Sequence, residues 1–62
     1  MTSTRFRECL ALLHWSQQGF SRILDTDERQ VRRWASGSAP IPAVVAAWLE
    51  VLAQHAAAYP PP

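Results

Sequence analysis

The strongest constraint on the fold of this chain is the short stretch between Asp27 and Gly37, because its own residues mark where a helix begins and ends. Asp27 is a good N-cap residue, and Gln30 stands three residues later, at the return position of a capping box. Gly37 stands where a left-handed residue would end a helix. These signals predict a helix over residues 28–36.

The two sides of this predicted helix differ in chemistry when residues are placed at ~100° intervals around its axis. One side is mostly apolar and suited to packing, and it consists of Gln30, Val31, Trp34 and Ala35. The other side is mostly cationic and consists of Glu28, Arg29, Arg32, Arg33 and Ser36. The cationic side is suited to contact with an anionic partner.

Positive charge is concentrated in the first half of the chain. All 6 arginines precede residue 34 and there is no lysine, so every cationic side chain can make forked contacts with phosphate or guanine. The net charge is nevertheless only +1, which is low for a nucleic-acid-binding protein. Two classes of partner therefore stay open for the arginine face: double-stranded DNA and an acidic protein.

Apolar periodicity predicts three further helices. The spacing of Phe6, Cys9, Leu10 and Leu13 predicts a helix over about residues 4–14. Ser16 is the predicted N-cap of a second helix that ends at Leu24 and buries Phe20, Ile23 and Leu24, with Trp15 packed on Phe20 as a hydrophobic staple. Pro42 is the predicted first residue of a last helix that continues to about residue 57.

The chain is therefore expected to form one all-α domain over residues 1–62, a compact bundle of four helices, or of five, with a short proline tail at residues 60–62. The longest apolar stretch, residues 41–53, is too short to span a bilayer and contains Glu50. A single cysteine, Cys9, cannot form an internal disulfide. We expect a soluble, cytoplasmic protein with no membrane association.

Residues suited to catalysis are scattered rather than grouped. His14 and His55 fall on different predicted helices, and Cys9 lies within an apolar stripe. No glycine-rich phosphate loop, paired-carboxylate cleft or metal-ligand spacing is present in the sequence. We expect no enzymatic activity, no metal, no cofactor and no small-molecule ligand.

Residues 25–27 leave only a tight turn between the second and third predicted helices, which is a helix-turn-helix spacing. The chain here resembles the phage Cro/repressor-type (XRE-like) helix-turn-helix proteins. The resemblance covers about residues 5–55 and is carried by Ser16-Gln17, Phe20-Ser21, Leu24, Val31, Trp34, Gly37, Pro40 and Pro42. Ser21 and Asp25 depart from the family, which most often has alanine and glycine there. The short chain also resembles small anti-CRISPR-associated phage autoregulators.

The resemblance implies a sequence-specific regulator, a repressor that binds double-stranded DNA as a homodimer, with the helix over residues 28–36 in the major groove. Arg29 and Arg33 are the candidates for base contacts, and Glu28 either accepts from a cytosine amine or pairs with Arg32. Candidates for DNA backbone contacts are Gln17, Arg32, Ser36 and Ser38. Candidates for the homodimer interface are Trp48, Val51, Leu52, His55 and Tyr59. Solvated surface charge is the favoured interpretation for Arg5 and Arg7.

Overall fold

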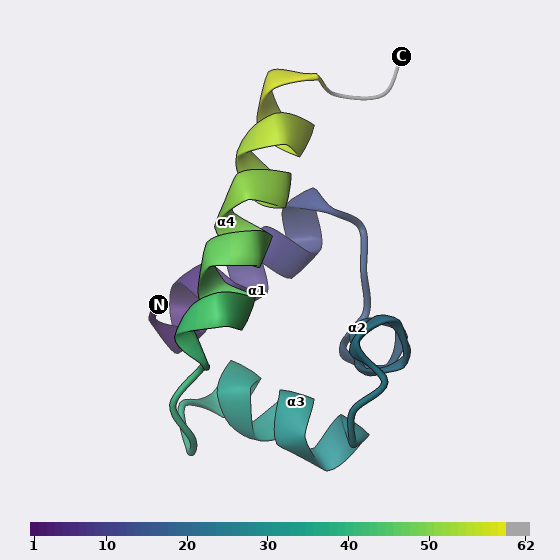
Figure 1. The fold of residues 1–62 in the computed structure, drawn as a ribbon, viewed down its shortest axis with the longest axis vertical. Coiled ribbons are helices and arrows are strands. Elements are labelled where there is room, and N and C mark those ends of the chain that lie inside the picture. The colour runs from purple at the N-terminus through teal and green to yellow at the C-terminus, as the bar shows by residue number, and fades with distance from the viewer. Residues whose placement is uncertain (60–62) are drawn as a thin grey trace.

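The fold is an all-α bundle, as predicted. The computed structural model describes residues 1–59 and contains four helices, α1 (Ser3–Leu12), α2 (Gln17–Leu24), α3 (Glu28–Ser36) and α4 (Ala43–Ala58). A fifth helix is not present in this part of the chain, and the predicted tail at residues 60–62 lies outside it. α4 packs beside α1 in the upper part of the view, α3 lies across the bottom, and α2 is seen end-on to the right (Figure 1). Within residues 1–59, no helix has the length and apolar character needed to cross a membrane.

The first helix begins and ends earlier than its apolar pattern indicated. Thr2 is the N-cap residue, and its Oγ1 accepts a hydrogen bond from the backbone N–H of Arg5 at 3.0 Å. The helix ends at Leu12, and His14 has a left-handed backbone with φ of 58°. Leu13 follows the apolar stripe but already lies in the connection, because a residue with positive φ cannot continue a right-handed helix.

The start of α2 has the predicted cap and staple. Ser16 Oγ accepts a hydrogen bond from the Gly19 N–H at 2.9 Å, and the rings of Trp15 and Phe20 stack with centroids 6.0 Å apart. The prediction for Ile23 was wrong, since this side chain is 49% exposed. Ser21 is buried instead, next to Phe20, whose ring contacts Phe6 of α1 and Trp48 of α4.

α3 has its predicted bounds, but its capping box is incomplete. Asp27 Oδ1 accepts from the Arg29 N–H at 2.9 Å. Gln30 does not return to the cap: its Oε1 accepts from Arg33 Nη1 at 3.2 Å, one turn further along the helix. Gly37 ends the helix in the left-handed region with φ of 84°, and a Cβ placed there would lie 3.4 Å from Ser3 Oγ.

The core is small and centred on aromatic rings. Phe6 of α1 meets Phe20 of α2 and Trp34 of α3 edge-on, with centroids 5.6 and 6.1 Å apart. Aliphatic and small residues complete it, namely Cys9, Leu10, Val31, Ala35, Leu49 and Ala53. Edge-to-face pairs add attraction beyond the burial of apolar area. Phe6 therefore joins the first three helices at one point.

α4 presents apolar residues on more than its core face. Pro42 is its N-cap rather than its first residue, so the helix begins at Ala43. Leu49 and Ala53 are buried against α1, whereas Val44 is 81% exposed and Val51 is 66% exposed. The last turns of α4 extend beyond the other three helices (Figure 1). A second apolar stripe of this helix is therefore left uncovered in the single chain.

Candidate nucleic-acid interface

The outward face of α3 carries the cationic side chains that were predicted there from the sequence. Val31, Trp34 and Ala35 are buried, and this burial fixes the rotation of the helix about its axis. Arg29 and Arg32 have side chains 74% and 56% exposed, and Arg33 is exposed as well. The bundle thus holds one side of α3 and leaves three guanidinium groups in solvent.

Two of these arginines lie close to carboxylates of the same helix terminus. Arg29 Nη2 is 3.5 Å from Asp27 Oδ2, and Arg32 Nη1 is 3.6 Å from Glu28 Oε1. Of the two interpretations of Glu28, the structure therefore contains the pair with Arg32. Such exposed ion pairs contribute little to stability, so a phosphate or a base edge could replace the carboxylate in either pair.

Asp27 has a pKa below its usual range. The main cause is the hydrogen bond from the backbone N–H of Arg29, and the charges of Arg29 and Arg33 act in the same direction. Arg33 itself has no carboxylate within 4.0 Å among residues 1–59, and its contact is the neutral amide oxygen of Gln30. Arg33 is consequently the least compensated cation of α3.

The candidate backbone-contact residues lie on separate elements. Ser36 Oγ donates to the Arg33 carbonyl oxygen at 3.2 Å and lies 2.8 Å from Ser38 Oγ, so these two exposed hydroxyls adjoin the end of α3. Gln17 is the half-buried first residue of α2. It lines an open hollow of about 290 Å³ with Arg7, Leu10, Ala11, Trp15 and Ser16.

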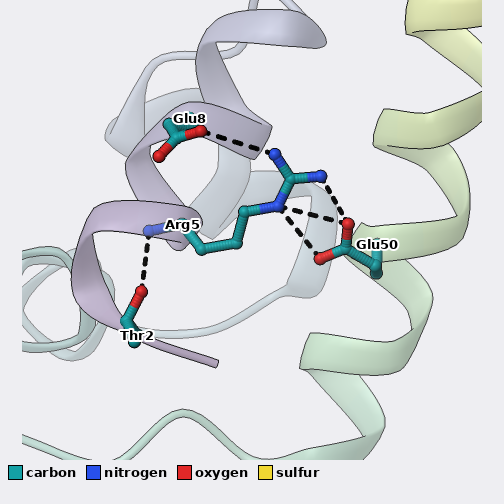
Figure 2. Close-up of polar contacts among 4 residues, drawn as sticks. All are labelled: Thr2, Arg5, Glu8 and Glu50. Carbon is teal, nitrogen blue, oxygen red and sulfur yellow. Dashed lines mark hydrogen bonds and ion pairs between the residues drawn. The ribbon is translucent and has the colours of Figure 1, made fainter.

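Arg5 has a role that the sequence did not indicate. Its Nε lies 3.2 and 3.1 Å from the two carboxylate oxygens of Glu50 on α4, Nη2 makes a further contact with Oε1, and Nη1 lies 3.5 Å from Glu8 (Figure 2). The hydrogen bonds from Arg5 lower the pKa of Glu50, and the same contact raises the pKa of Arg5. The interpretation of Arg5 as a solvated charge was therefore wrong.

Arg7 also contacts another helix. Its Nη1 donates to the carbonyl oxygen of Ala35 in the last turn of α3. The two partners are 28 residues apart, and a single sequence carries no signal for a contact at this separation. Arg7 is exposed, but its guanidinium is held by this bond to α3, which differs from the free surface charge that we expected.

The residues predicted for a homodimer interface lie on α4 or directly follow it, and they do not share one environment. Val51 is 66% exposed, Tyr59 is 73% exposed, and the rings of His55 and Tyr59 are in contact with centroids 4.9 Å apart. Leu52 is half-buried, since it lies nearer the core side of the helix. Trp48 is partly in solvent and partly in the core. It is 38% exposed, and its ring stacks on those of Trp15 and Phe20 with centroids 6.0 and 6.2 Å apart.

Five of the exposed residues of α4 have a heptad spacing. Alternating steps of four and three residues connect the members of this uncovered stripe, which are Val44, Trp48, Val51, His55 and Ala58. We call this set the α4 seam. Spacing of this kind keeps side chains in register along a second helix that packs beside the first. None of the five side chains is a carboxylate, lysine or arginine.

The structure groups no residues for metal binding or thiol chemistry in its described part. Among residues 1–59, no three His, Cys, Asp or Glu side chains lie close enough to hold a metal ion. Cys9 is fully buried in the core, and this burial raises the pKa of its thiol.

No model of a protein family matches this chain, and comparisons with curated proteins and with solved structures also yield no match. The arrangement of α2 and α3 and the charge on α3 are therefore the observations from which function is inferred.

Proposed function

We propose that this chain is a sequence-specific DNA-binding transcriptional regulator of the phage Cro/repressor type, a repressor that binds a palindromic operator as a homodimer. The supporting observation is the division of α3 into a buried face of Val31, Trp34 and Ala35 and an exposed face with three arginines. A helix anchored on one side, protruding on the other, and joined to its predecessor by a three-residue turn has the form that enters a major groove.

Arg33 and Arg29 are the proposed base-contact residues, and Glu28 is the third candidate. An arginine fork bonds the O6 and N7 atoms of guanine, and a good pair discriminates against a wrong base by ~1–3 kcal/mol. Arg33 is the stronger candidate because its charge is not compensated by a carboxylate in residues 1–59. Arg29 must exchange its contact with Asp27 for the base.

Contacts to the DNA backbone fix the position of the protein without carrying sequence information. Gln17, Arg32, Ser36 and Ser38 are the proposed residues of this class. Gln17 lies at the N-terminus of α2 and the two serines lie at the end of α3, so they would contact separate phosphates on either side of the inserted helix.

The homodimer forms through α4 in this model of function. One domain that contacts a few base pairs binds weakly, and a second copy related by a two-fold axis adds a half-site about one helical turn away, ~34–36 Å. The α4 seam together with Leu52 and Tyr59 is the proposed interface. Its support is the heptad spacing and the exposure of Val44 and Val51.

The test is fluorescence anisotropy with duplexes chosen by selection from a random pool. Arg33→Ala should weaken binding to the selected duplex and relax the preference at one base pair, whereas Gln17→Ala should weaken binding to all duplexes about equally. A palindromic selected sequence would support the dimer. An Arg33→Ala variant with unchanged affinity and preference would contradict the assignment of base contacts.

A second candidate function is a helical module whose arginine face binds an acidic protein. The low net charge of +1 favours it, as do the carboxylates beside Arg29 and Arg32. A salt titration separates the two candidates, because DNA affinity falls linearly with salt on a double-logarithmic plot. Failure to bind any duplex at low salt would favour the protein partner.

A further inference from the structure

Arg7 has a guanidinium group that is held in place yet electrically uncompensated. Nη1 donates to the Ala35 carbonyl oxygen and Nη2 lies 3.5 Å from Thr4 Oγ1, so both contacts are to neutral oxygens. Within residues 1–59, Arg5, Arg29 and Arg32 each have a carboxylate within 4.0 Å, but Arg7 does not. A positioned cation without a counter-charge favours an anionic ligand.

Arg7 also lies between elements that carry proposed backbone contacts. It lines the hollow of about 290 Å³ together with Gln17, and no acidic residue lines that hollow. Its partner Ala35 directly precedes Ser36. Arg7 of α1 and Gln17 of α2 therefore both border the hollow, next to the end of α3 that carries Ser36.

We propose that Arg7 is a further phosphate-binding residue, which contacts the same segment of the DNA backbone as Gln17. The inference rests on the proposed DNA-binding function. The bond to Ala35 holds one side of the guanidinium against α3, and the remaining N–H groups donate to a phosphate in the hollow beside Gln17. Arg7 thereby links the position of α3 to the position of the DNA backbone.

The salt dependence of DNA binding tests this role. Arg7→Gln removes the charge but keeps an amide that can donate to the Ala35 carbonyl oxygen. One lost phosphate contact lowers the slope of log affinity against log salt by about 0.9, so affinity falls about eightfold less over a tenfold rise in salt. The loss of affinity at fixed salt should be equal for matched and mismatched duplexes.

Arg22→Gln is the matched control. Arg22 is exposed and also has no carboxylate within 4.0 Å among the described residues, but it does not line the hollow. Its substitution should change the slope clearly less than Arg7→Gln does. Equal slopes for the two variants would overturn the assignment of Arg7.

A measurement on the unchanged protein covers the case in which Arg7→Gln fails to fold. The Nε–H resonance of Arg7, assigned by its loss in Arg7→Lys, should shift when duplex is added. An unshifted resonance in a protein that does bind duplex would overturn the role of Arg7 alone. Absence of binding to any duplex at low salt would overturn the proposed function and this inference together.

Discussion

Arg5 and Glu50, which are 45 residues apart, join α1 to α4 through a guanidinium that contacts both oxygens of one carboxylate (Figure 2). The hydrogen bonds from Arg5 hold the pKa of Glu50 below its ordinary value. A carboxylate with a lowered folded-state pKa stabilises the fold above its unfolded-state pKa, and this contribution is lost as the pH falls through the folded-state value.

Glu50→Gln should therefore lower the thermal midpoint at neutral pH by a few degrees. The difference from the unchanged protein should shrink as the pH falls and vanish below the folded-state pKa, where both chains are uncharged at this position. Circular dichroism melts over a series of pH values provide the measurement. Glu8→Gln is the control, because Glu8 makes only the longer contact of 3.5 Å with Arg5 and should have a smaller effect. A pH-independent difference would contradict the ion-pair explanation.

Asp25 has a left-handed backbone with φ of 53° at the turn between α2 and α3. Left-handed geometry costs an ordinary residue ~1–2 kcal/mol, and glycine avoids this cost. Part of the resulting gain in stability is lost, because glycine also has greater conformational freedom in the unfolded chain. Asp25→Gly should raise the free energy of unfolding by up to about 1 kcal/mol in urea titrations. Thr26→Gly, at a position without positive φ, should lower it.

Trp34 has a buried indole N–H without a hydrogen-bond partner among the described residues. An unsatisfied buried donor costs ~1–3 kcal/mol. Trp34→Phe removes that donor but leaves a gap where the larger ring was, so its unfolding free energy should stay within about 1 kcal/mol of the unchanged protein. Trp34→Ala should lose ~3–5 kcal/mol and unfold a domain of this size. A loss in Trp34→Phe as large as that in Trp34→Ala would contradict the expected gain from removing the unsatisfied N–H.

Val51 lies at the centre of the α4 seam and is 66% exposed. Val51→Glu places two like charges together across the proposed two-fold axis, so the dimer dissociation constant should rise at least about a hundredfold while the monomer stays folded. Sedimentation equilibrium measures the association, and circular dichroism measures the helix content. Ala57→Glu is the control, because Ala57 is exposed on α4 outside the seam. Monomeric behaviour of the unchanged chain at all concentrations would exclude this interface.

Local signals were sufficient to predict the helix-turn-helix segment. The bounds of α3, the cap at Ser16 and the left-handed Gly37 each depend on a few neighbouring residues, and all were predicted. The rotation of α3, with its arginines outward, followed from helical periodicity. These features need no knowledge of the rest of the fold.

Contacts between helices could not be predicted in the same way. The partners of Arg5 and Arg7 depend on how α1 crosses α4 and α3, and no local pattern encodes that crossing. Ile23 was expected in the core because it is apolar, yet it is 49% exposed and Ser21 is buried in its place. The exposed arginines of α3 were therefore predicted from the sequence, whereas the contacts that Arg5 and Arg7 of α1 make with other helices were not.

The aromatic contacts of the core extend without interruption through all four helices, from Trp34 to Phe6, from Phe6 to Phe20, and from Phe20 to Trp48. Every helix contributes a ring to this network, so no helix has a hydrophobic core of its own that would stay packed if the other helices unfolded. Unfolding of any one whole helix would break at least one of these aromatic contacts and expose a ring, which couples the opening of each helix to the others. The slowest-exchanging backbone amides of α1 and α3 should then share one exchange free energy, that of global unfolding.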